Sequence, residues 1–463
     1  MKTKDIFNRM GKFLMKHIVY VSIILVCLVI FLTDNEVKFW KVPGRVIAHD
    51  VKSYYAYLPA VFIHRDISLD TLNENFALNN NLQSIKHNNG KFFLRYTMGN
   101  AIMYLPFFIV AHVTSPLLGY EQNGYTSPYK IALLISSAFF LIIGLLFLRK
   151  YLLNYYSPIS VAIALFAVVV GTNLLFYSTF EAPMPHVYGF SLIAAFLYMT
   201  TLWYKKPNAG NSITLGIIFG LISLIRPSNI IVGLFFVLYN IRGIYDLKDR
   251  ARFLLINYRK LLFIIVFIFL VWIPQLLYWK YITGQFLFYS YEDQGFNLIN
   301  PQIINSLFSY KKGWFIYTPI MLFAVIGLFF LRKYQPGILI PLILFLILNI
   351  YILSSWFQWY FGGSFGLRAY IDSYGILIIP LAALIQFFIQ LKNRYLIPFL
   401  IVFALIVAFN VFQTWQYYYG SIHWVNMNKE SYWESFGKLK PTERFYQLIQ
   451  EEEMKDNECR NQQ

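Results

Sequence analysis

Asp50 is the first side chain in this 463-residue sequence whose surroundings suggest chemistry. It stands near the start of HDVKSYYAYLPAVF, where apolar side chains recur at helical spacing. These apolar positions are Val51, Tyr54, Tyr55, Leu58, Val61 and Phe62. A helix with such a face can lie on a bilayer, with Asp50 at its N-terminal end. Asp50 then either caps this helix, which is worth about 1 kcal/mol, or acts as a general base on a substrate carried in the lipid.

A second acidic position lies in the segment STFEAPMPHVYGF, which carries Glu181 and His186. Pro183 and Pro185 stand between them and fix the turn. A lone Glu and a lone His in a short loop are more often solvated or capping groups than ligands. The alternative is that both side chains line a binding site.

Arg226 interrupts the apolar segment LISLIRPSNIIVG, where Pro227 breaks the helix. An arginine at the centre of a membrane helix costs about 2.5 to 3.5 kcal/mol, so its presence there needs a reason. One reason is that the side chain extends to the outer headgroups. The other is that the guanidinium binds a phosphate through charge-assisted contacts.

Arg368 and Asp372 lie four residues apart in WFQWYFGGSFGLRAYIDSYG. At this spacing they could pair with each other on one helix face. The glycines Gly362, Gly363 and Gly366 allow the backbone to approach a ligand closely. The segment could therefore equally shape a pocket for a lipid headgroup.

The elements that position these residues are membrane helices. Apolar residues make up 58% of the chain and charged residues only 13%, and the apolar ones form blocks long enough to cross a bilayer. We predict an all-α polytopic membrane protein with about eleven transmembrane helices. The predicted spans are about 17–32, 130–148, 159–178, 187–203, 212–225, 229–241, 260–279, 315–331, 337–354, 373–391 and 396–412. The first follows a basic N-terminus without a cleavage site, which predicts an uncleaved anchor whose N-terminus is cytoplasmic.

The charge pattern sets the expected topology. The net charge of +17 comes from basic residues between the spans, not from a basic stripe, so it argues against nucleic-acid binding. Every second connection between the predicted spans is basic. These basic connections lie on the same side of the membrane as the N-terminus only if residues 100–118 do not cross the membrane. We therefore predict one large outer loop, 34–129, with interfacial helices near 50–63 and 100–118. Residues 1–412 form the transmembrane domain, and 413–463 form an outer tail whose polar end we expect to be poorly ordered.

Several familiar sites are missing from the sequence. It has no Gly-rich phosphate loop, no zinc-spaced Cys or His set and no Ser-centred nucleophile elbow. Cys27 and Cys459 lie in segments too different to predict a disulfide framework. We predict no cofactor, leave any divalent metal requirement open, and expect an activated substrate that arrives in the lipid.

The layout resembles the GT-C superfamily of membrane glycosyltransferases, which includes protein O-mannosyltransferases and the bacterial aminoarabinose transferase. The similar features are a first span that enters from the cytoplasm and an acid close behind it, here Asp50 followed by Tyr54 and Tyr55. A proline-containing helix, LPFFIVAH, then precedes the second span. The segments GTNLLFYSTFEAPMPHVYGF, LIRPSN and GSFGLRAYIDSYG also resemble bacterial members of this group.

The resemblance implies transfer of a sugar from a polyprenyl-phosphate donor to an acceptor hydroxyl on a glycan, lipid or protein, with inversion. Asp50 would be the general base, and Arg226 and Arg368 would hold the donor phosphate. Glu181 and His186 would line the acceptor side. The remaining residues assigned to substrate binding are Tyr54, Tyr55 and Asp372. The site would face the periplasmic side of a bacterial inner membrane, in a step of cell-envelope glycan synthesis.

Relatives in this group often have an Asp-Glu pair, whereas Val51 follows Asp50 here, so a second acid has to come from elsewhere. Two other classes of function remain. A transporter or lipid-linked sugar flippase would place ionisable residues near the middle of the bilayer, while the candidates here lie at segment ends. A non-catalytic membrane subunit would use the long loop to bind a partner and would tolerate the loss of Asp50.

Overall fold

The protein is mostly helical in a computed structural model that describes residues 2–74 and 82–461. Within these ranges, seven helices are long and apolar enough to cross a membrane. They are α1 (Lys2–Val37), α7 (Ser127–Leu152), α10 (Pro185–Lys205), α14 (Tyr258–Thr283), α18 (Pro336–Ser354), α19 (Tyr374–Ile389, preceded by the turn η5, Arg368–Ser373) and α20 (Asn393–Tyr419). The chain is thus a multi-pass membrane protein, as its apolar blocks predict.

The other four predicted spans coincide with shorter helices. They are α8 (Pro158–Val170) with α9 (Leu174–Tyr177), α11 (Ala209–Ile225), η4 (Pro227–Gly233) with α12 (Leu234–Val237), and α16 (Trp314–Tyr317) with α17 (Ile320–Tyr334). Proline explains one of these breaks: Pro227 has no N–H to donate and disfavours helical backbone at the residue before it. Arg226 is accordingly extended, with φ −146° and ψ 106°, and α11 ends there.

Two helices form the centre of the bundle. α10 and α19 are the most deeply buried of the seven membrane-length helices, and α17 packs along α19 as α7 does along α10. Glycines allow close approach: a Cβ at Gly327 of α17 would clash with the Pro380 carbonyl oxygen of α19. Small residues at such crossings are typical of membrane helix packing. The centre of the bundle is therefore closely packed.

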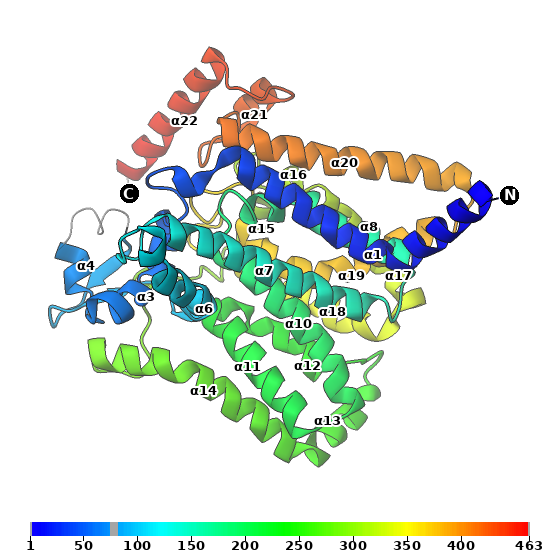
Figure 1. Cartoon of the computed structure of the whole chain (residues 1–463), viewed down its shortest axis with the longest axis horizontal. Coiled ribbons are helices and arrows are strands. Elements are labelled where there is room, and N and C mark those ends of the chain that lie inside the picture. The colour runs from blue at the N-terminus through cyan, green and yellow to red at the C-terminus, as the bar shows by residue number, and fades with distance from the viewer. Residues whose placement is uncertain (1, 75–81, 462–463) are drawn as a thin grey trace.

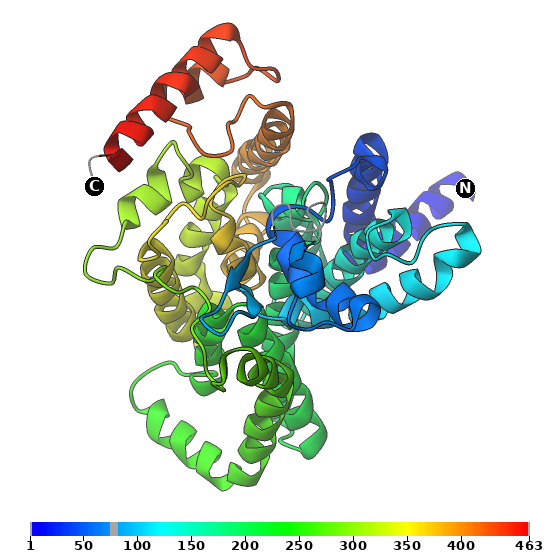
Figure 2. The same cartoon turned by 90° about the vertical axis from the view of Figure 1, so that its left-hand side faces the viewer.

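The segment between α1 and α7 covers one end of the bundle, here called the loop end (Figure 1). It contains η1 (Phe39–Lys41), α2 (His49–Tyr55), α3 (Tyr57–Pro59), η2 (Ala60–His64), α4 (Asp70–Glu74), β1 (Ser84–Lys86), β2 (Phe92–Leu94), α6 (Gly99–Thr114) and η3 (Pro116–Leu118). Figure 2 looks onto this end and shows these blue and cyan elements lying across its middle. The two strands form an antiparallel hairpin, with Ile85 opposite Phe93, which the sequence analysis did not predict.

The helix expected near residues 50–63 forms, but its environment differs from the prediction. We expected its apolar face to lie on the bilayer. Val51, Tyr55 and Leu58 are each at most 4% exposed, because α2 and α3 pack against α6. Only the end of the predicted apolar face, Val61 and Phe62, is exposed. The second expected interfacial segment, 100–118, forms α6, a 16-residue helix at the loop end (Figure 1).

The C-terminal tail is helical as far as Asn461, which includes most of the polar stretch, residues 451–463, that we expected to be poorly ordered; the last two residues of that stretch lie outside the described residues. It contains α21 (Lys429–Ser435) and α22 (Glu443–Asn461), which pack on each other. A capping box starts α21, in which the Asn428 side chain accepts from the Ser431 amide and the Ser431 hydroxyl accepts from the Asn428 amide. Phe445 and Ile449 of α22 are buried. These two residues pack the first half of α22 and lie before the polar stretch, which begins at Glu451. The remaining helices are α13 (Asp246–Ile256) and α15 (Ile303–Phe308).

Candidate functional site

Asp50 lies in the first turn of α2 and does not cap it. Ala48 is the N-cap residue, and no side chain makes a capping hydrogen bond there. The Asp50 carboxylate instead accepts a hydrogen bond from Arg368 Nη2 at 2.8 Å and one from Gln83 Nε2 at 2.7 Å. The capping interpretation is therefore wrong. Burial raises the pKa of Asp50, but the Arg368 charge and the hydrogen bonds from Arg368, Tyr96 and Gln83 outweigh it and hold the pKa below its usual range.

Asp372 forms a second buried ion pair, with partners on three elements. Arg226 Nη1 and His186 Nδ1 each lie 3.3 Å from a carboxylate oxygen of Asp372. Asn229 Nδ2 donates to Oδ2 at 2.7 Å. Arg226 is thus paired and does not merely extend to headgroups. Arg368 and Asp372 do not pair with each other, because each has a partner elsewhere in the chain.

A glycine lets α10 approach the second pair. A Cβ at Gly189 would lie 2.8 Å from the carboxyl carbon of Asp372, closer than such contacts occur in proteins. Gly189 is one turn after His186 on α10, so the same helix supplies the imidazole and the space beside the carboxylate. Any larger residue at this position would move Asp372 or the helix.

The two ion pairs share one neighbourhood. Tyr54 of α2 is buried and stacks on Tyr96 with ring centroids 4.3 Å apart. The charges of Asp50, Arg226 and Arg368 all act on the Tyr54 hydroxyl. We call six residues whose charges act on one another the ionic cluster: Asp50, Glu181, His186, Arg226, Arg368 and Asp372.

Glu181 differs from the two other acids of the ionic cluster. It lies in the turn between α9 and α10, and its carboxylate has no hydrogen bond or ion pair among the residues that the structure describes. The Glu181 carboxylate nevertheless interacts electrostatically with Arg368, Asp50, Lys312 and Arg45. Burial raises the pKa of Glu181 to about 7, and the nearby cations only partly offset this effect.

Tyr55 is the candidate residue that the structure does not bring into the ionic cluster. Its hydroxyl donates to the Gly124 carbonyl at 2.5 Å, and its ring packs against Phe108 and Tyr125. Tyr55 thus holds the end of the long loop against α6.

His186 does belong to the cluster, and its second ring nitrogen, Nε2, is buried without a hydrogen-bond partner among the described side chains.

Five residues that contact or surround the ionic cluster were not predicted from the sequence: Gln83, Tyr96, Asn229, Tyr291 and Lys312. Asn229 could have been found, since it follows Arg226 by three residues in the same broken helix. Lys312 could not have been found, because it lies in the sequence Lys-Lys-Gly, which has no feature that distinguishes it from other basic loop segments.

Lys312 links the ionic cluster to the C-terminal tail. It is 1% exposed and donates hydrogen bonds to the carbonyls of Ser364 and Trp424. Burial and the neighbouring Arg368 lower the pKa of Lys312 well below its usual range. The Ser364 amide also donates to the Trp424 carbonyl, at 3.1 Å. The tail is therefore fastened beside the glycine-rich segment that precedes Arg368.

The arrangement favours an anionic ligand. Three acids of the cluster lie among four arginines, namely Arg45, Arg95, Arg226 and Arg368, and beside the amine of Lys312. A guanidinium carries five N–H donors, and Arg226 and Arg368 each make one side-chain hydrogen bond in the described structure. Their side chains are 17% and 16% exposed, so the uncommitted donors remain reachable. Within residues 2–74 and 82–461, no three His, Cys, Asp or Glu side chains form a group that could hold a metal ion.

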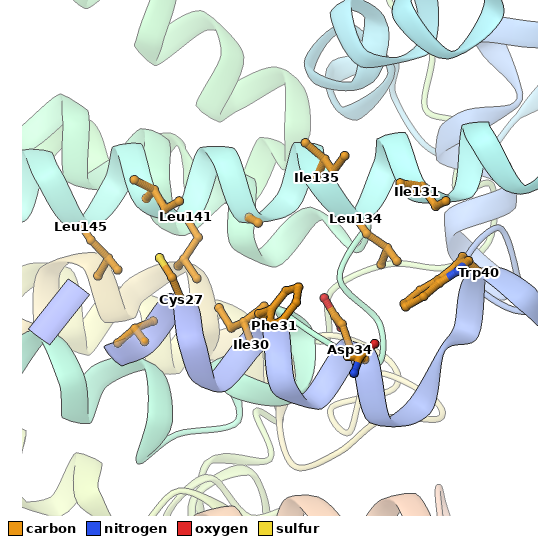
Figure 3. Close-up of a pocket in the computed structure, with 14 residues that line it drawn as sticks. Cys27, Ile30, Phe31, Asp34, Trp40, Ile131, Leu134, Ile135, Leu141 and Leu145 are labelled. Carbon is orange, nitrogen blue, oxygen red and sulfur yellow. The ribbon is translucent and has the colours of Figure 1, made fainter. Parts of the chain in front are cut away.

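A separate hollow of about 420 Å³ lies between α1 and α7. Figure 3 shows apolar side chains of both helices along it, with Asp34 and Trp40 towards one end. None of its lining residues belongs to the ionic cluster. The charged residues, and not this hollow, therefore define the candidate site.

The fold and the ionic cluster together define a multi-pass helical membrane protein with a polar site at the loop end of its bundle. Two solved structures resemble it. The archaeal oligosaccharyltransferase AglB from Archaeoglobus fulgidus, in complex with an inhibitory peptide and a dolichol-phosphate, matches with a TM-score of 0.51 and 10% identity over 87% of this chain. An Archaeoglobus fulgidus oligosaccharyltransferase in the apo form matches with a TM-score of 0.50 and 12% identity over 93%.

These matches show that the chain shares its fold with the two archaeal proteins over most of its length. It spans 56% and 60% of the length of the two archaeal chains. No protein-family model matches the sequence, and no curated protein matches it.

Proposed function

We propose that this protein is a membrane glycosyltransferase that moves a sugar from a polyprenyl-phosphate donor to an acceptor hydroxyl. The observation that carries the proposal is the pair of arginines, Arg226 and Arg368. They come from different elements, each is fixed by a carboxylate, and each keeps free donors. Such a pair can grip a phosphate and stabilise the charge that develops as it leaves. The fold supports the same class, because one archaeal chain of this architecture was solved with a dolichol-phosphate bound.

In this proposal the site faces the non-cytoplasmic side of a bacterial inner membrane, and the acceptor is a glycan, lipid or protein. The basic connections at the opposite ends of the helices support this orientation through the positive-inside rule. The acceptor oxygen attacks the anomeric carbon from the face opposite the phosphate, so the configuration inverts. The sequence makes Asp50 the candidate for the general base. Its ion pair with Arg368 makes its carboxylate a weaker proton acceptor.

The experiment uses the purified full-length chain in liposomes that contain labelled polyprenyl-phosphate sugars and extracted envelope acceptors. The wild-type protein should transfer label, while Asp50→Asn and Arg226→Gln should lose most of the activity. The matched control is Asp293→Asn, since Asp293 is exposed and lies outside the ionic cluster. If the wild-type chain moves the intact labelled lipid across the bilayer and transfers no sugar, the protein is a flippase and the proposal is wrong.

A further inference from the structure

The three carboxylates of the ionic cluster differ in how they are held. Asp50 and Asp372 each face an arginine at 2.8 Å and 3.3 Å and accept an amide hydrogen bond from Gln83 or Asn229. A carboxylate held this way is a poor proton acceptor, because protonation would break its ion pair and leave a buried guanidinium uncompensated. Glu181 has none of these contacts, and its side chain is partly reachable from solvent.

We propose that Glu181 is the general base of the sugar transfer and that Asp50 is a positioning residue that holds Arg368. This assignment rests on the proposed function. The acceptor hydroxyl oxygen forms the new bond to the anomeric carbon while the bond from that carbon to the phosphate oxygen breaks. The hydroxyl proton passes to the Glu181 carboxylate. The electron pair of the broken bond stays on the phosphate oxygen, which faces Arg226 and Arg368 and leaves as polyprenyl phosphate.

The surroundings of Glu181 suit this role. Two prolines, Pro183 and Pro185, follow it and restrict the backbone of its turn. The charged and titratable groups that act on it or respond to it come from several elements: Arg45, Asp50, Tyr177, Lys312, Arg368 and Tyr417. Because burial raises the pKa of Glu181 to about 7, the carboxylate can both accept and release a proton near neutral pH. It also supplies the second acid that the sequence lacks next to Asp50.

The test is the pH dependence of transfer by the full-length protein in liposomes with labelled polyprenyl-phosphate sugar. A base must be deprotonated to act, so wild-type kcat/KM should rise about tenfold per pH unit below pH 7 and level off above it. Glu181→Gln should lose this rising limb and about 100-fold or more in rate. Asp50→Asn should lower the rate through the loss of Arg368 positioning while keeping the limb.

Two further variants separate chemistry from folding. Glu181→Asp keeps a carboxylate at the turn and should retain the rising limb at a reduced rate. Glu430→Gln makes the same amide replacement on the exposed surface of α21 and should leave the profile unchanged. If Glu181→Gln keeps the limb and Asp50→Asn removes it, Asp50 is the base and our assignment is overturned. If the wild-type chain transfers sugar from no donor, the proposed function fails, and this assignment fails with it.

Discussion

The Asp50–Arg368 pair offers a direct test of how the long loop is attached to the helical bundle. The two residues are 318 positions apart in sequence, and Arg368 Nη2 lies 2.8 Å from Asp50 Oδ2. Both side chains are 16% exposed, so solvent screens the pair only weakly. Removing one partner of a buried pair costs about 3–5 kcal/mol, because the remaining charge is left uncompensated. Given the partial exposure, we expect the lower end of that range, about 3 kcal/mol.

A double-mutant cycle measures this coupling. For a large chain, 1 kcal/mol corresponds to roughly 2 °C in melting temperature, so Asp50→Asn and Arg368→Gln should each lower the Tm in detergent by about 6 °C. The double variant removes both charges and leaves neither uncompensated, so its Tm should lie closer to the wild-type value than that of either single variant. The control pair, Asp293→Asn with Arg252→Gln, changes two exposed residues and should barely move the Tm. Losses that simply add in the double variant would refute the pairing.

Three other perturbations test the same geometry. Gly189→Ala places a methyl group 2.8 Å from the Asp372 carboxyl carbon and should cost about 1–3 kcal/mol by overpacking while reducing transfer at least tenfold, measured as Tm and rate. Lys312→Met removes a donor to the Ser364 and Trp424 carbonyls and should speed protease cleavage of the tail near residues 420–428 several-fold. Because the pKa of Asp50 is held below 3.8, its pair stabilises the fold at neutral pH and is lost as the pH falls through the lowered value, so the Tm difference between wild type and Asp50→Asn should disappear in strong acid.

The sequence predicted the helices well because lipid imposes a simple rule. A segment that crosses hydrocarbon must be apolar throughout and must satisfy its backbone internally, so both its position and its helical state can be seen in the residues themselves. Each of the eleven predicted spans contains helix, but only seven helices of the described residues are long and apolar enough to cross a membrane. Helix length was harder to predict, because Gly171 and Pro227 end α8 and α11 before they reach membrane length.

The candidate residues could be chosen from sequence, but their partners could not. Asp50, Arg226 and Arg368 stood out as charges at the edges of apolar segments, and all three meet in the ionic cluster. Tyr55 lies next to Tyr54 on the same predicted apolar helix face, yet its hydroxyl donates a hydrogen bond to the Gly124 carbonyl and it does not join the ionic cluster. Neighbouring positions on one helix point in different directions, and only the packing of α6 decides which tyrosine faces the charges.

The clearest mismatch between spacing and contact lies in the turn η5. At four residues apart, Arg368 and Asp372 would lie on one face of an α-helix and could pair. The structure forms a 3-10 turn over Arg368–Ser373 instead, and with three residues per turn, positions i and i+4 point about 120° apart. Arg368 therefore faces Asp50 of the loop, while Asp372 faces Arg226 and His186 of the bundle.

This separation gives the short turn a specific consequence. Each end of η5 is fixed to a different part of the molecule by an ion pair, so a ligand anion bound by both arginines would lie between the loop and the bundle. An α-helical turn would let Arg368 and Asp372 neutralise each other and would leave Asp50 and Arg226 without partners. A Gly366→Ala change should expose this dependence, since Gly366 has φ +57° and a Cβ there would lie 2.9 Å from the Tyr317 Cβ. It should displace η5 and lower the Tm, and a variant that keeps the wild-type Tm and transfer rate would show that the geometry of this turn is not required.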